Sequence, residues 1–98
     1  MMQDYAESAR WLRKAADQGE AMAQSYIGVM HTMGQGVPQD YVQAHKWCNL
    51  AAAHLPASKK KLRDQAVKLR DAIAAKMTPA QIAEAQKLAS EWKPKPAK

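Results

Sequence analysis

The side chains of this sequence whose chemistry could support catalysis or metal binding are one cysteine and three histidines. His45 and Cys48 are three positions apart, which places them on one side of a helix, whereas His54 falls on another side. A zinc site takes four protein ligands, or three and a water molecule. Two ligands do not meet this requirement, so we expect no metal site and interpret Cys48 as a packed thiol beside a surface imidazole.

Nucleophilic catalysis by Cys48 would need a base, a third group that orients the base, and donors for an oxyanion. His45 is a candidate base, but no oxyanion-hole motif accompanies the pair, and the carboxylates are scattered along the chain. Asp4 and Asp40 precede helix-like runs and are explained as N-caps. The sequence therefore predicts a protein that is not an enzyme and has no cofactor.

The stretch HTMGQGVPQDY at residues 31–41 contains a Gly-Gln-Gly sequence that could suggest a phosphate-binding loop. Such a loop follows a strand and opens a helix with its free N–H groups aimed at the ligand. Here the loop follows a helix-like run, and no strand is predicted anywhere. We therefore interpret Gly34 and Gly36 as the residues that end one helix and turn the chain toward the next.

The elements that would position these residues repeat every 36 positions. The segment DYAESARWLRKAA at 4–16 aligns with DYVQAHKWCNLAA at 40–52 through Asp, Tyr, Trp and two Ala matches. Helical spacing of apolar residues between the two copies predicts helices at about 4–18, 20–33 and 40–54. Gly28, inside the second helix, costs about 1 kcal/mol relative to Ala. We therefore expect a close approach by a second helix through Ala44, Ala51 and Ala52.

This repeat resembles the Sel1-like repeat, a relative of the tetratricopeptide repeat. The residues that carry the resemblance are Ala23, Ile27, Gly28, Gly34, Gly36, Val37, Ala44, Trp47, Ala51 and Ala52. The sequence departs from the family pattern at His31, where an aromatic residue is usual, and at Cys48, where Tyr or Phe is common. The resemblance implies an all-α fold, an α-solenoid of antiparallel helix-turn-helix repeats, and a role as an adaptor that binds other proteins.

Two further helices are predicted in the second half of the chain. An apolar stripe predicts a fourth helix at about 58–76, and Thr78, Pro79 and Gln81 form a capping box at the start of a fifth. We interpret this pair, at 57–92, as a C-terminal cap on the repeat region at 1–56, and 93–98 as a disordered basic tail. The MTPAQIAEAQ segment also resembles C-termini of bacterial members of the family.

The first predicted helix is the second half of a repeat whose first half is absent from the sequence. Its apolar residues Tyr5, Ala9, Leu12 and Ala16 therefore lack an expected cover. Two interpretations remain open: self-association as a homodimer or helix-exchanged oligomer, or a fragment of a longer protein. We expect the groove residues Gln24, Tyr26 and His31 to contact a protein or peptide partner.

The excess positive charge lies entirely in the second part of the chain. Residues 1–58 hold four basic and five acidic groups, whereas residues 59–98 hold eleven basic and four acidic groups. The alternative function is therefore binding of nucleic acid or another anionic surface. No nucleic-acid motif accompanies these residues, so we rank this second. The sequence has neither a signal-peptide pattern nor a membrane span, which predicts a cytoplasmic location, or a periplasmic or secreted one if the N-terminus was truncated.

Overall fold

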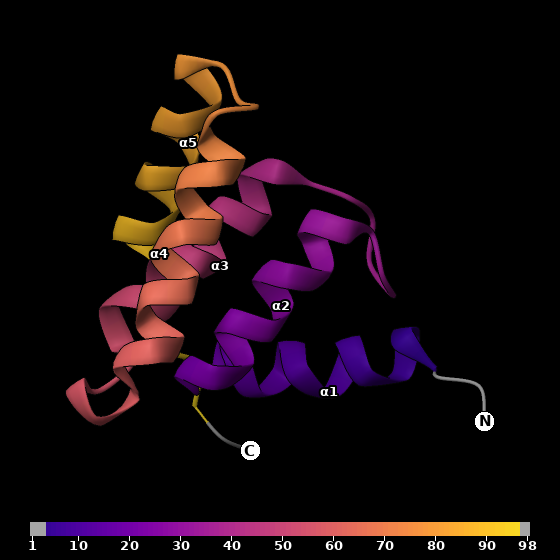
Figure 1. Ribbon diagram of the computed structural model, residues 1–98. Helices are drawn as coiled ribbons and strands as arrows, with labels where there is room; N and C mark the ends of the chain where they lie inside the picture. Colours follow the sequence, from indigo (N-terminus) through magenta and orange to yellow (C-terminus); the bar gives the residue numbers. More distant parts are fainter. Residues whose placement is uncertain (1–3, 97–98) are drawn as a thin grey trace.

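The computed structural model describes residues 4–96, and within this range it contains helices and no strand. The elements in chain order are α1 (Tyr5–Asp17), α2 (Ala21–Met33), α3 (Tyr41–His54), the short 3-10 helix η1 (Ala57–Lys59), α4 (Lys60–Ala74) and α5 (Pro79–Glu91). Consecutive helices run antiparallel, and α3 lies between α2 and the α4–α5 pair (Figure 1). The predicted all-α helical repeat fold is confirmed.

Side-chain caps fix the starts of three helices. Asp4 and Asp40 accept hydrogen bonds from the backbone N–H groups of Glu7 and Gln43 at 3.0 and 3.1 Å. The capping box before α5 is present with both of its hydrogen bonds. Each cap contributes about 1 kcal/mol because it satisfies a donor that the helix leaves free. All three predicted caps are confirmed.

The loop between α2 and α3 reverses the chain through glycines with positive φ. Gly34 ends α2 at φ 70°, and Gly36 follows at φ 75°. A Cβ atom on Gly36 would collide with the backbone carbonyl of Tyr5 at the start of α1. The loop is therefore both a turn and a packing contact between the two repeats, as expected for structural rather than ligand-binding glycines.

Gly28 lets α2 and α3 approach closely, as predicted. A Cβ atom at Gly28 would lie 2.7 Å from Cys48 Sγ, 3.3 Å from Cys48 N and 3.5 Å from Ala44 O. Ala44 is thus a correctly predicted neighbour, but the closest one is Cys48. Ala51 and Ala52 lie a further turn away along α3 and are not among the three nearest contacts.

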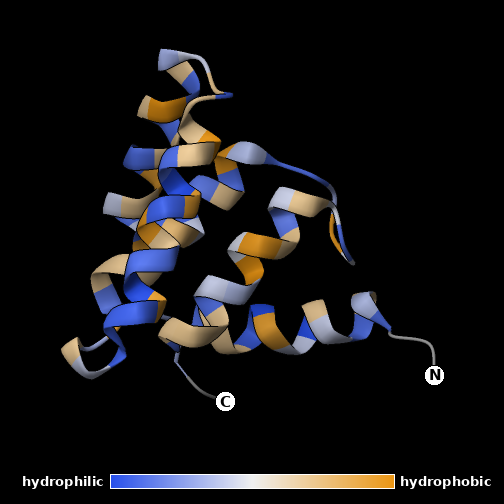
Figure 2. Cartoon of the chain, viewed as in Figure 1, coloured by the Kyte–Doolittle hydropathy of each residue, from blue (hydrophilic) through white to orange (hydrophobic). Residues whose placement is uncertain are grey.

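The core follows α3 along its length. Trp47 is fully buried at the junction of α1, α2 and α3, and Cys48, Ile73 and Ala85 fill the space between α3 and the last two helices. The predicted boundary near residue 56 falls between α3 and η1, although α3 shares its core with α4 and α5. In Figure 2, α4 is mainly blue, whereas α2 carries mostly white to orange residues.

The end of the chain returns to the first repeat. Trp92, just beyond α5, packs edge-on against Trp47 with ring centroids 6.3 Å apart. The backbone N–H of Lys95 then donates to the carbonyl oxygen of Asp17 at 2.7 Å, at the end of α1. Residues 93–96 are therefore extended but anchored, which corrects the expected disorder there. Residues 97 and 98 of the predicted tail lie outside the described part.

Candidate interaction surface

Large hydrophobic side chains that remain exposed are confined to the first two helices. Within residues 4–96 these exposed side chains are Tyr5, Trp11, Met22, Tyr26, Val29 and Met33. In the last three helices the large apolar residues are buried or half-buried instead. Contiguous exposed apolar surface commonly marks an interaction site, so α1 and α2 carry the candidate surface.

Four of these residues form one stripe along α2. Met22, Tyr26, Val29 and Met33 are spaced by four, three and four positions, which places them on one face of the helix. The opposite face, which includes Ile27 and Gly28, is fully buried against the rest of the protein. Helix α2 is therefore apolar on two faces, and only one of them has a partner within residues 4–96.

The stripe borders a groove between α1 and α2. This groove measures about 280 Å³. A separate depression of about 350 Å³ lies elsewhere on α1. The residues that line the groove are Tyr5, Ser8, Leu12, Tyr26, Val29, Met30 and Gln35. Aromatic and methionine side chains provide an apolar floor that adapts to different partners.

The groove has a counterpart one repeat further along the chain. Tyr26, Val29 and Met30 of α2 line the groove. The residues 43 positions further along the chain are Leu69, Ala72 and Ile73 of α4, and they line a second depression. Tyr5 corresponds likewise to Tyr41, at the repeat offset of 36. At this second position Thr32 of α2 forms part of the wall, and the space that remains is only about 120 Å³. In the described chain, no helix takes the equivalent place over the α1–α2 groove.

Of the three predicted partner-binding residues, Tyr26 alone is exposed. Gln24 is fully buried: its side-chain N–H donates to Ala16 O at 3.2 Å, and its Oε1 accepts from His54 at 3.0 Å. His31 is also buried, and its Nδ1–H donates to Pro38 O at 3.1 Å. Both side chains stabilise the junction between helices, so their assignment to a partner surface is corrected.

Two of the four predicted self-association residues are buried, and the other two line the groove. Ala9 and Ala16 are buried in the core formed with α2, so they are not an open surface. Tyr5 and Leu12 line the groove instead. Sequence reasoning also missed Trp11, which is 63% exposed although its repeat counterpart Trp47 is fully buried.

The Cys48–His45 pair is not arranged for chemistry. Burial raises the pKa of the Cys48 thiol to about 12, so the thiolate is not available near neutral pH. His45 is only 3% exposed, which corrects the expected surface imidazole. Residues 4–96 contain no group of three His, Cys, Asp or Glu side chains placed to hold a metal ion. Over the same range, no helix is long and apolar enough to span a membrane.

Two buried histidines predict a dependence of stability on pH. Burial lowers the pKa of His31 and of His45 below the ordinary value of 6.5, with Arg70 contributing at His45. Because the unfolded chain binds these protons more readily, stability is fully present above about pH 6.5 and falls below it, by up to about 1.4 kcal/mol per pH unit for each histidine.

We expect urea unfolding, followed by circular dichroism, to show this loss as the pH is lowered from about 6.5. The variant His31→Phe should lose its share of the dependence, because no imidazole remains to be protonated. An unchanged pH profile in this variant would contradict the assignment to His31.

The architecture defines the class of protein: an α-solenoid of helical repeats with an open groove at its first two helices. Residues 1–20 and 21–54 match the Sel1 repeat family, so the chain belongs to that family. This agrees with the 36-residue repeat, the Gly28 contact and the Gly34–Gly36 turn.

Two relatives are similar over much of this chain. Chitin synthase regulatory factor 3 of Schizosaccharomyces pombe is 42% identical over 62 residues, which is 62% of this chain and 7% of that protein. The crystal structure of c5321, a protective antigen of uropathogenic Escherichia coli strains with an SLR fold, superposes with a TM-score of 0.76 at 32% identity. The match covers 91% of this chain and 18% of that chain. This sequence therefore spans a small part of each relative.

Proposed function

We propose that this protein is a non-catalytic interaction scaffold that binds an amphipathic helix of another protein in the α1–α2 groove. The proposal rests on the stripe of exposed apolar side chains on α2, two of which, Tyr26 and Val29, line this groove. At α3–α4 the depression is walled by a preceding helix, α2, whereas the corresponding groove at α1–α2 has no such helix within residues 4–96. A single amphipathic helix is the element that fits this place.

The chemistry of the groove supports the same occupant. Tyr26 and Val29 are 48% and 36% exposed, so burying them against an apolar helix face would be favourable. Helix-in-groove recognition uses anchors at positions i, i+3, i+4 and i+7, which an amphipathic helix supplies. The S. pombe relative is named as a regulatory factor, and a regulatory role that acts through bound proteins is compatible with this groove.

The groove is tested by placing a charge in its floor. We expect Tyr26→Glu to abolish capture of the partner from an extract of the native host, because a buried unpaired carboxylate opposes docking of an apolar helix. The matched control is Gln65→Glu on the exposed face of α4, which introduces the same charge away from the groove. Proteins captured by the wild type and by Gln65→Glu, but lost with Tyr26→Glu, would be identified by mass spectrometry.

The proposal fails if Tyr26→Glu captures the same proteins as the control. Circular dichroism of both variants establishes that each is folded. Light scattering over a concentration series distinguishes a second copy of this chain as occupant. If the wild type has the mass of a dimer and Tyr26→Glu has the mass of a monomer, the occupant of the groove is a second copy of this chain and not a helix of another protein.

A further inference from the structure

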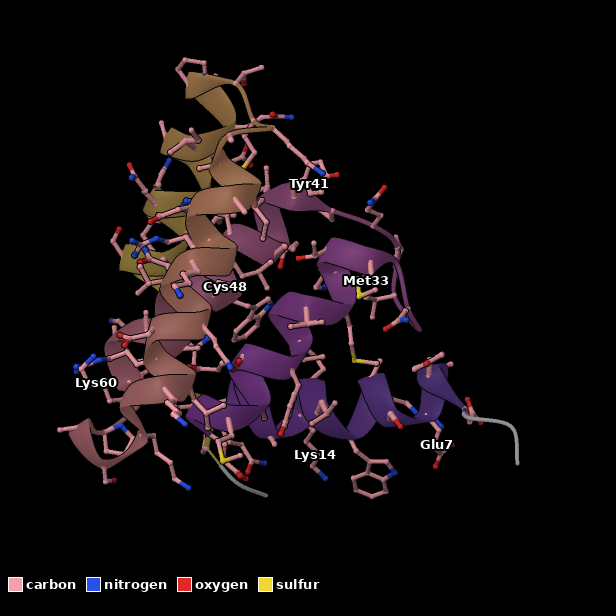
Figure 3. All side chains as sticks on the ribbon, in the orientation of Figure 1. Glu7, Lys14, Met33, Tyr41, Cys48 and Lys60 are labelled. Atoms are coloured by element: carbon pink, nitrogen blue, oxygen red, sulfur yellow. The ribbon has the colours of Figure 1, made fainter. Side chains whose placement is uncertain are left out.

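A further depression, distinct from the α1–α2 groove and from its α3–α4 counterpart, lies on α1. It measures about 350 Å³ and is lined by Arg10, Arg13, Lys14, Asp17, Gln18, Lys95 and Pro96. We call this depression the basic cleft. In Figure 3, Lys14 and Glu7 point away from α2, so the cleft and the groove occupy different faces of α1. The cleft exists because the C-terminal segment returns to the end of α1, where Lys95 is anchored.

One carboxylate at the wall of the cleft is shared by two cations. Arg13 Nε lies 3.1 Å from Asp17 Oδ1, and Lys95 Nζ lies 3.6 Å from Asp17 Oδ2. Asp17 neutralises one of these two positive charges and leaves the other uncompensated. The sequence is misleading here, because Lys95 belongs to the basic second part of the chain and joins the first part only through the fold.

A further lysine lies close to the same group. Lys46 is 9% exposed, and its Nζ lies 4.2 Å from the centre of the Trp47 ring. Burial lowers the pKa of Lys46, the positive charges of Arg13 and Lys95 lower it further, and the carboxylate of Asp17 partly opposes them. The protein therefore concentrates repelling cations at this position, and a bound anion would relieve the repulsion.

The rim of the cleft adds two more cations and an aromatic ring. Arg10 pairs with Glu7 at 2.7 Å, and Lys14 Nζ lies 5.8 Å from the centre of the exposed Trp11 ring. Together with Arg13 and Lys95, four lining cations face the two carboxylates of Glu7 and Asp17. The cleft therefore has room and charge for more than one additional carboxylate.

We propose that the basic cleft binds an acidic segment of a partner protein, with side-chain carboxylates held by Arg10, Arg13, Lys14 and Lys95. Arginine presents parallel N–H donors that match a carboxylate. Trp11 beside the cleft offers an apolar wall for a neighbouring side chain of the same segment. This site is independent of the helix-binding groove.

The internal carboxylates favour a peptide over a nucleic acid. Glu7 accepts a hydrogen bond from the Trp11 indole N–H at 3.3 Å, so a negative charge lies at the ring that a base would stack on. Lys14 lies over the face of the same ring. A chain of regularly spaced phosphates would meet both Glu7 and Asp17, whereas a flexible acidic peptide can place its carboxylates between them.

Fluorescence anisotropy with a labelled hexaglutamate peptide at low salt tests the proposal. We expect the double variant Arg10→Gln, Lys14→Gln to bind about tenfold more weakly, since each exposed ion pair contributes up to about 1 kcal/mol. The matched control is Lys61→Gln, Lys68→Gln, which removes the same charge from α4 and should change binding by less than about twofold. The groove variant Tyr26→Glu should also retain binding, which separates this site from the proposed function.

The variant Asp17→Asn is expected to strengthen peptide binding, which an unfolded variant would not do. Removing the competing carboxylate frees Arg13 and Lys95, so the peptide should bind several-fold more tightly. The proposal is overturned if the wild type does not bind the peptide, if the cleft and control variants weaken binding equally, or if Asp17→Asn does not strengthen it. Preferential binding of a hexauridylate competitor would overturn it in favour of nucleic acid.

Discussion

Replacing Trp47 by alanine will lower the free energy of unfolding by about 3–5 kcal/mol, the usual cost of deleting a large buried aromatic side chain. Trp47 is fully buried, packs against Trp92, and has the cationic groups of Lys46 and Arg13 at its ring. It joins the first repeat to the C-terminal segment, so its loss leaves a cavity that no single helix can fill. Small domains have a total stability of only about 5–15 kcal/mol.

Urea unfolding followed by circular dichroism measures the effect, and Trp11→Ala is the matched control. The same side chain is deleted there, but Trp11 is 63% exposed, so we expect a change within about 0.5 kcal/mol. Equal losses in the two variants would show that the two tryptophans have equivalent roles in the repeats and would contradict this packing.

Introducing valine at Gly28 will destabilise the protein by about 3 kcal/mol, at the upper end of the usual range for overpacking. The first carbon of the new side chain would lie 2.7 Å from Cys48 Sγ and 3.3 Å from the backbone nitrogen of Cys48. A helix should otherwise gain stability when glycine is replaced. A loss therefore reports the contact between α2 and α3, and urea unfolding measures it.

The contact with the thiol is isolated by a double-mutant cycle. Gly28→Ala should cost less stability in a Cys48→Ala background than in the wild type, because the closest atom has been removed. A wild-type unfolding midpoint for Gly28→Val, or strict additivity in the cycle, would refute the close approach.

Local signals in the sequence predicted the helix starts well. Asp4, Asp40 and Thr78 cap neighbouring backbone groups within their own segments, so their roles need no knowledge of the tertiary structure. Gly28 was predictable for a related reason: a glycine inside a helix is unfavourable unless a close neighbour requires it. The 36-residue repeat then supplied the order in which these helices pack.

The orientation of α2 could not be predicted in the same way. Apolar residues occupy two of its faces, so periodicity did not distinguish the face that packs on α3 from the exposed face. Gln24 was expected in the groove from its helical spacing, yet it is buried where it satisfies Ala16 O and His54. The repeat also implied that Trp11 and Trp47 are equivalent, although only Trp47 has helices on both sides.

The basic cleft was beyond sequence reasoning for a different reason. Charge counts placed the positive excess in residues 59–98, whereas the cleft combines Lys95 with residues of α1. That contact depends on Trp92 packing beside Trp47 and carrying the chain back over the end of α1. Such long-range placement has no local signature.

Photocrosslinking in the native host tests whether the α1–α2 groove receives a helix from another protein. A benzophenone amino acid would replace Tyr26 in one variant and Gln65, on the exposed face of α4, in the other. We expect a crosslink from position 26 to a helical segment of another protein, and none from position 65. Equal crosslinking from both positions, or none from position 26, would contradict it.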